Sequence, residues 1–144
     1  MNDQIDGSSS YPAYEALLFD MDGTLFDTEA RCDVMLQELL EGWGAWPEGG
    51  HDLSHHHGST WPTIAEDLLE YLPEGATPPT AEFLLATFES SLAVVPPPAV
   101  AGARATLEAA IESVPTAIVT SSNLTTVQLL LPAFGLSEQD LLCI

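Results

Sequence analysis

The stretch FDMDGTL, residues 19–25, decides the fold, because it places two carboxylates, Asp20 and Asp22, two positions apart and directly before Gly23. The run that leads into it, EALLF at 15–19, is short and apolar, which is typical of a buried parallel strand. Ligands of α/β proteins gather at the carboxyl ends of such strands. The order strand, acid, acid, glycine therefore predicts an α/β fold with both acids in a site at the end of the first strand.

A second strand of the same character is predicted at residues 116–120, TAIVT, where a β-branched apolar run ends in a small hydroxyl residue. Elsewhere apolar residues recur at helical spacing, and capping residues and prolines mark where helices begin and end. Residues 96–98 are three prolines, a stiff connector where we expect a domain boundary. Residues 141–144 have the pattern of a further strand. The predicted helices cover residues 28–42, 60–72, 80–92, 101–113 and 124–134.

The charge balance excludes one class of partner. The chain has 22 acidic residues, only Arg31 and Arg104 as basic ones, and a net charge of −20, whereas nucleic acids are held by basic side chains. This charge suits a salt-loving host and a merely very soluble protein equally well. No apolar run reaches the ~18 residues of a membrane helix, and residues 1–10 lack the features of a secretion signal. Cys32 and Cys143 are isolated, which favours a cytoplasmic location.

Residues 19–25 and their continuation FDTE at 26–29 resemble the first motif of the haloacid dehalogenase (HAD) superfamily, in its phosphoglycolate phosphatase and β-phosphoglucomutase-like branch. The segment IVTSSN at 118–123 resembles the second motif of the same superfamily. The resemblance implies an α/β fold in which a Rossmann-like parallel sheet core carries an inserted α-helical cap. It divides the chain into a disordered tail at 1–13, a partial core at 14–27 and 97–144, and a helical cap at 28–96.

An aspartate can attack a phosphoryl group in line and form an acyl phosphate, which divides one hard displacement into two easier ones. The resemblance implies that Asp20 is this nucleophile and that Asp22 is its acid/base partner. It also implies a Mg²⁺ ion held by the Asp20 carboxylate and the Asp22 backbone carbonyl. Substrate binding is expected at Gly23, Thr120 and Ser121, through the hydroxyl of Thr120 and the backbone N–H of Ser121. The alternative is that these residues only turn and cap the strand ends.

Two features of the expected cap stay open at this stage. The loop HHHGS, residues 55–59, falls where related caps present a specificity loop, so a histidine there either bonds a sugar or phosphate or lies in solvent. Adjacent histidines are no strong zinc signature, because no separate ligand pair stands at suitable spacing. Arg31 either reaches the phosphate from the first cap helix or lies near the surface among acidic residues.

The resemblance predicts a Mg²⁺-dependent phosphatase that acts on a small phosphorylated metabolite. The third family motif supplies a lysine or arginine and the fourth supplies acidic metal ligands, and neither has a counterpart in this sequence, which has no lysine. We therefore expect an N-terminal portion that is slow or inactive by itself, because closely spaced acids and a phosphate need a cation. A sugar-phosphate mutase and a non-catalytic binding module are the alternatives. The oligomeric state stays open.

Overall fold

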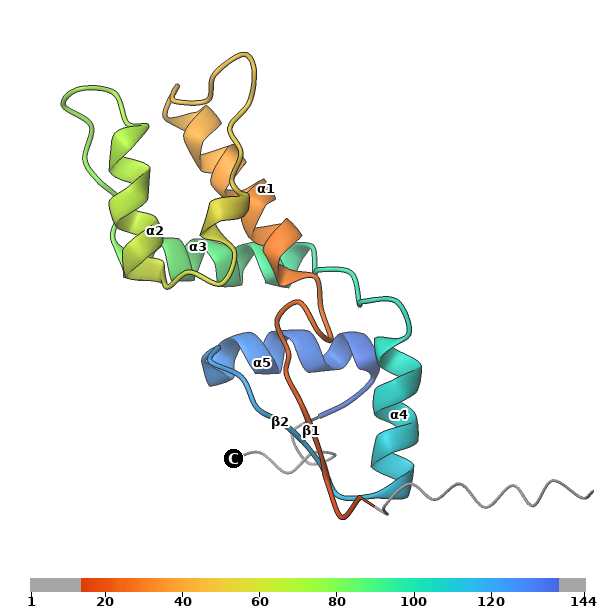
Figure 1. Cartoon of the computed structure of the whole chain (residues 1–144). Coiled ribbons are helices and arrows are strands. Elements are labelled where there is room, and N and C mark those ends of the chain that lie inside the picture. Colours follow the sequence, from red (N-terminus) through yellow and green to blue (C-terminus); the bar gives the residue numbers. More distant parts are fainter. Residues whose placement is uncertain (1–13, 138–144) are drawn as a thin grey trace, which may run out of the picture.

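The computed structural model describes residues 14–137 (Figure 1), so the expected tail at 1–13 and strand at 141–144 lie outside the described residues. Strands β1 (Leu17–Phe19) and β2 (Thr116–Ile118) form a two-stranded parallel sheet in which Leu18 pairs with Ala117. A parallel pair needs a crossover connection, and here the crossover contains four α-helices. Figure 1 shows α1, α2 and α3 on one side of the molecule and β1, β2, α4 and α5 on the other.

The helices of the first group begin where the sequence places caps. Asp27 and Thr80 accept backbone N–H bonds at the starts of α1 and α3, and Thr60 does so at the start of α2. The helix expected at 60–72 is shorter than predicted, because the chain tightens into a 3₁₀ turn after residue 67. The elements are α1 (Thr28–Gly42), the 3₁₀ turn η1 (Ser54–His56), α2 (Trp61–Asp67), the 3₁₀ turn η2 (Leu68–Glu70) and α3 (Ala81–Val94).

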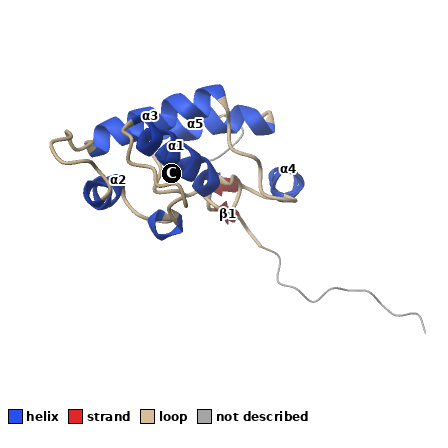
Figure 2. Cartoon of the chain, turned by 90° about the horizontal axis from the view of Figure 1, so that it is seen from above, coloured by secondary structure: helices blue, strands red, loops and turns tan. Residues whose placement is uncertain are grey.

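On the other side of the molecule, α4 (Ala103–Ser113) precedes β2, and α5 (Leu124–Leu130) with the 3₁₀ turn η3 (Leu131–Phe134) follows it. The start predicted at residue 101 is two residues too early, because Gly102 has a left-handed backbone with φ 82° and precedes the first helical residue. The helix predicted at 124–134 changes to a 3₁₀ turn because Pro132 has no N–H to donate. Figure 2 shows α2 and α4 at opposite ends of the molecule.

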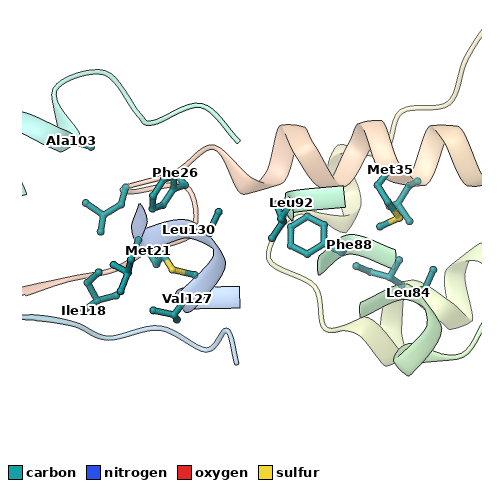
Figure 3. Close-up of a cluster of buried hydrophobic side chains, with 14 of the residues drawn as sticks. Met21, Phe26, Met35, Leu84, Phe88, Leu92, Ala103, Ile118, Val127 and Leu130 are labelled. Carbon is teal, nitrogen blue, oxygen red and sulfur yellow. The ribbon is translucent and has the colours of Figure 1, made fainter. Parts of the chain in front are cut away.

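One buried apolar cluster joins the two groups of elements. Figure 3 shows Met21, Phe26, Ile118, Val127 and Leu130 packed near the strands, and other side chains packed among the helices of the α1–α3 group. The rings of Phe26 and Phe134 stack with centroids 4.5 Å apart, which fixes the end of the first loop against η3. In the α1–α3 group, the buried side chains labelled in Figure 3 are Met35, Leu84, Phe88 and Leu92.

The chain leaves and re-enters the strand side of the molecule along two paired segments. The N–H of Asp27 donates to the carbonyl of Pro98 at 2.9 Å, and the N–H of Val100 donates to the carbonyl of Leu25 at 3.0 Å. These bonds hold the two connections of the α1–α3 group side by side. They lie close to the expected boundaries at residues 28 and 96, although the division into domains stays a prediction.

The first strand differs from the prediction in one respect. We expected residues 15–19 to form a buried strand, but β1 contains only residues 17–19 and its Leu18 side chain is 66% exposed. By contrast, every residue of β2 is buried. The difference arises because β1 pairs only with β2 among the described residues and no described helix covers Leu18. No helix within residues 14–137 is long and apolar enough to cross a membrane.

Candidate active site

A tight turn directly after β1 positions the two predicted acids. The carbonyl of Met21 accepts the N–H groups of Leu25 and Phe26, and the N–H of Gly23 donates to the carbonyl of Phe26 at 2.8 Å. Gly23 permits the turn because its φ is 71°, a value that other residues rarely adopt. The Met21 side chain is fully buried, so the residues on either side of it, Asp20 and Asp22, are held at the surface of the same pocket.

Three hydroxyl groups hold the carboxylate of Asp22. Its Oδ1 accepts a hydrogen bond from Thr28 Oγ1 at 2.8 Å, and its Oδ2 accepts bonds from Thr120 Oγ1 at 3.1 Å and Ser122 Oγ at 2.8 Å. The donors come from the start of α1 and from the loop after β2, so this carboxylate ties both segments to the β1 turn. A carboxylate held from several directions has little rotational freedom, which is what a positioned proton-transfer group requires.

The carboxylate of Asp20 has a different environment. The residue is exposed, and its Oδ2 accepts one hydrogen bond, from Thr24 Oγ1 at 3.0 Å. No residue within 14–137 donates a hydrogen bond to Oδ1. This oxygen is therefore available to attack a substrate or to bind a cation.

The loop after β2 contributes polar groups to the same site. The N–H of Ser122 donates to Thr120 Oγ1 at 3.0 Å, and Asn123 caps α5 by accepting the N–H of Thr126 at 2.9 Å. Ser121 is exposed and lines the pocket. Thr120 lies behind Asp22 and directs its hydroxyl proton to that carboxylate.

Of the three predicted substrate-binding residues, Ser121 alone lines the pocket. Gly23 and Thr120 support the two acids through the turn and through the hydrogen bond to Asp22. Contact of any of the three with a substrate stays a prediction.

Sequence reasoning missed three hydroxyl residues that contact the acids, namely Thr24, Thr28 and Ser122. All three lie inside the motif segments that were singled out. A signal was therefore present, because small hydroxyl residues beside a carboxylate at a strand end are natural hydrogen-bond donors. Their pairing with a particular acid depends on how the helical group packs on the strands.

A pocket of about 590 Å³ opens between the acids and the helices of the other group. This volume suits a small metabolite. No lysine or arginine is among the described residues that line it, and its acidic lining residues are Asp20, Asp22 and Glu29. The remaining described walls come from η1 and the loop after it, from the loop after β2, and from parts of α1, α2, α3 and α5. They include Thr28, Cys32, His56, His57, Trp61, Ile64, Leu85, Phe88, Ser122 and Asn123.

The histidine loop forms part of the pocket wall, and its members differ in environment. His56 is buried at 3% exposure, so the alternative of histidines lying in solvent does not hold for it. Burial and the neighbouring His55 lower the pKa of His56. The ring of His57 bonds Asp33 Oδ2 at 2.9 Å, and this hydrogen bond raises the pKa of His57.

Two further residues of α1 were of interest in the sequence. Burial, with Asp33 and Glu29 nearby, raises the pKa of the Cys32 thiol to about 12. The thiol of Cys32 is therefore protonated near neutral pH and is a poor nucleophile although it lines the pocket. Arg31 does not line the pocket, and its Nε is buried without a hydrogen-bond partner among the described residues.

The donor set at the end of β1 fits a magnesium ion. Mg²⁺ prefers oxygen ligands and is held in phosphoryl-transfer sites by one or two carboxylates together with substrate phosphate. Asp20 offers its Oδ1, which accepts no hydrogen bond from residues 14–137. The Asp22 carboxylate already accepts hydrogen bonds from three hydroxyl groups, so the ligand that this residue offers is its backbone carbonyl. That either aspartate binds the ion stays a prediction.

The comparisons with known proteins place this arrangement in a family. Residues 14–140 match the model of the haloacid dehalogenase-like hydrolases. The chain belongs to this family of hydrolases. The curated proteins contain no match to the sequence.

Solved structures show the same fold. A mutant of CbbY from Rhodobacter sphaeroides, in complex with xylulose-(1,5)-bisphosphate, is 22% identical with a TM-score of 0.62, and the match covers 88% of this chain and 60% of that one. The putative HAD-hydrolase YfnB from Bacillus subtilis, bound to magnesium, is 20% identical with a TM-score of 0.59, covering 92% and 65%. A putative phosphoglycolate phosphatase from Lactobacillus plantarum is 20% identical with a TM-score of 0.59, covering 92% and 62%.

These matches confirm the predicted fold class and the resemblance to the HAD superfamily. The chain spans between 60% and 65% of the length of the three structures.

Proposed function

We propose that this chain carries the nucleophile and the acid/base residue of a Mg²⁺-dependent phosphatase that acts on a small phosphorylated metabolite in the cytoplasm. The observation that carries the proposal is the contrast between two neighbouring carboxylates at one pocket. Asp20 presents an oxygen to which no residue of the described part of the chain donates a hydrogen bond, whereas Asp22 is held by three hydroxyl groups. A nucleophile needs a free lone pair, and a proton-transfer group needs a fixed position.

In the proposed reaction, a carboxylate oxygen of Asp20 attacks the phosphorus atom in line with the ester oxygen. The bond from phosphorus to the leaving oxygen breaks, and Asp22 gives this oxygen a proton. A water molecule then attacks the aspartyl phosphate, and Asp22 takes its proton. Phosphate leaves and Asp20 is regenerated. Mg²⁺, when bound, supplies positive charge that offsets the repulsion between the carboxylate and the phosphate.

The substrate class rests on the pocket and on the neighbours. A volume of about 590 Å³ with an apolar far wall, from Trp61, Ile64 and Phe88, suits a small molecule that places its phosphate at the acids. One structural neighbour was solved with a sugar bisphosphate, and another is a putative phosphoglycolate phosphatase. These two neighbours support a small phosphorylated metabolite as the substrate.

The chain should turn over slowly by itself. Its pocket brings three carboxylates near the position of the phosphate, and the 144 residues contain no lysine to offset that charge. Electrostatic stabilisation of the transferring phosphoryl group, which such a cation supplies in phosphoryl-transfer enzymes, would be weaker. The test must therefore detect a single phosphorylation event as well as turnover.

Acetyl phosphate with Mg²⁺ provides such a test, because its acetate leaving group needs no proton. After acid quenching, reduction with borohydride converts an aspartyl phosphate into homoserine, which peptide mass spectrometry locates. We expect homoserine, the label left by the aspartyl phosphate, at position 20. The Asp20→Asn protein should lose this label and should release phosphate more slowly by about 10³-fold or more.

The matched control is Asp27→Asn, because asparagine can replace aspartate as the cap of α1 and position 27 does not line the pocket. This variant should keep the label at position 20. Label on another residue, or unchanged labelling of the Asp20→Asn protein, would refute the assigned nucleophile. Absence of label from every residue would favour a non-catalytic module. In a separate assay with a hexose phosphate as substrate, an isomerised sugar phosphate in place of free phosphate would favour a mutase.

A further inference from the structure

A cluster of side chains that could bind a metal ion includes two residues of the histidine loop (residues 55–59) and none of the acids at β1. One ring nitrogen of His55, one of His56 and one carboxylate oxygen of Asp67 all lie within 4.8 Å of one another. The histidines belong to η1 and Asp67 is the last residue of α2, so the cluster joins two elements of the cap. The sequence offered no separate ligand pair near the histidines, but the turn between η1 and α2 brings Asp67 to them.

The state of His56 is the strongest observation in this cluster. Its side chain is 1% exposed, and both ring nitrogens are buried without a hydrogen-bond partner among the described residues. Asp67 Oδ2 lies 3.6 Å from His56 Nδ1, which is too long for a hydrogen bond. Buried polar groups in folded proteins are almost always satisfied, so an imidazole in this state indicates an ion or a water molecule as its partner.

His55 is oriented as a metal ligand would be. Its Nδ1 lies 2.8 Å from the backbone carbonyl of Asp52, and because a carbonyl can only accept, this nitrogen must carry the proton. The lone pair of the neutral ring is then on Nε2. A histidine that donates one ring N–H to a carbonyl and coordinates through the other nitrogen is the usual arrangement at metal sites. The rings of His55 and His56 have centroids 3.8 Å apart, so the two imidazoles lie side by side.

We propose that His55, His56 and Asp67 bind a divalent transition metal ion, with Zn²⁺ as the best match. Two imidazoles and one carboxylate, with a further position for water, form a ligand set that zinc accepts and that magnesium, which prefers oxygen, does not. Zinc bonds of 2.0–2.2 Å at a tetrahedral angle place two ligands about 3.4 Å apart, close to the 3.6 Å between His56 Nδ1 and Asp67 Oδ2.

Zinc binding requires small changes in the positions of the ligand atoms, and the His55 and Asp67 side chains can make these changes. His55 is exposed and the Asp67 side chain is 45% exposed, so both can rotate toward an ion held at the buried His56. A bound ion would tie η1 to α2. Residues 56–60 between these elements line the substrate pocket, so the ion would fix that wall of the pocket. The site is thus structural, and it does not depend on the phosphatase proposal.

The test is a titration of the tag-free chain with Zn²⁺ in competition with a zinc-binding dye. The Asp20→Asn background is used because it weakens divalent binding at the β1 acids. We expect His55→Gln and Asp67→Asn, which change exposed side chains, each to weaken zinc binding by about tenfold or more. His56→Gln should do the same, and the parent with Co²⁺ should show the visible absorption of a tetrahedral site.

The matched controls are Glu66→Gln, which removes a neighbouring exposed acid from α2, and His57→Gln, which removes the third histidine of the loop. Both should keep the zinc affinity of the parent. Zinc should also raise the Tm of the parent more than that of Asp67→Asn, because binding to the folded state stabilises it. The proposal is overturned if the parent binds zinc no more tightly than the His55→Gln and Asp67→Asn variants do.

Discussion

Two carboxylates separated by a single residue differ in this structure because of the hydroxyl groups around them. Asp22 accepts three hydroxyl bonds from two distant segments, and Asp20 accepts one from its own turn. Each hydrogen bond from a hydroxyl group restricts the orientation of the carboxylate that accepts it, and so restricts the direction in which the carboxylate gives or takes a proton. The division of labour between nucleophile and acid/base partner therefore has a structural basis that neither aspartate provides alone.

A prediction at this scale concerns Ser122. Ser122→Ala removes the 2.8 Å hydroxyl bond to Asp22 Oδ2, so the carboxylate is less well positioned to activate water. We expect the aspartyl phosphate at Asp20 to hydrolyse up to about 10²-fold more slowly, as decay of the trapped label would show. Ser122→Thr, which keeps the hydroxyl, should restore the rate.

The control for this change is Ser90→Ala, because the Ser90 hydroxyl donates to a backbone carbonyl on α3, away from the pocket. That variant should hydrolyse the phosphoenzyme at the rate of the parent. Equal decay rates for Ser122→Ala and the parent would show that the hydroxyl does not position Asp22.

At the scale of the elements, α3 connects α1 and α2 to the strand side of the molecule. It packs against α1, α2 and α5, and its residues Leu84, Phe88 and Leu92 are buried. Phe88 also lines the pocket. The stability of this one helix therefore supports both the apolar cluster and the pocket wall.

The cap of α3 gives the corresponding prediction. Thr80 Oγ1 accepts the N–H of Phe83 at 3.1 Å, and Thr80→Ala leaves that N–H without its partner. We expect the free energy of unfolding to fall by about 1 kcal/mol, measured by urea denaturation. Thr80→Asn keeps a capping oxygen and should stay close to the parent, whereas a loss of equal size in both variants would assign the effect to something other than the cap.

For the whole molecule, charge is the dominant feature. The net charge is −20 over 144 residues. Among the basic side chains of residues 14–137 other than histidine, only Arg104 forms an ion pair, with Glu108. Like charges on a folded protein repel one another, and salt reduces the range of that repulsion. The folded state is therefore expected to be weakest in dilute buffer.

Thermal unfolding in NaCl measures this effect. Between about 0.01 M and 1 M the screening length falls from roughly 30 Å to 3 Å, so we expect the Tm to rise with salt. A triple variant, Glu48→Gln with Glu74→Gln and Glu112→Gln, neutralises exposed acids outside the pocket and should show a smaller rise. A Tm that is flat or falls with salt would mean that repulsion among the acids does not limit the stability.

The sequence alone determined the order of the elements, most of the helix starts, and the position of both acids after the first strand. These depend on local backbone preferences and on hydrophobic periodicity, which a short segment carries by itself. Only the tertiary structure decided that Ser122 meets Asp22 and that His56 lies buried beside Asp67. Such contacts join residues that are far apart in the chain or on different elements, so they exist only once the helices have packed on one another and on the strands.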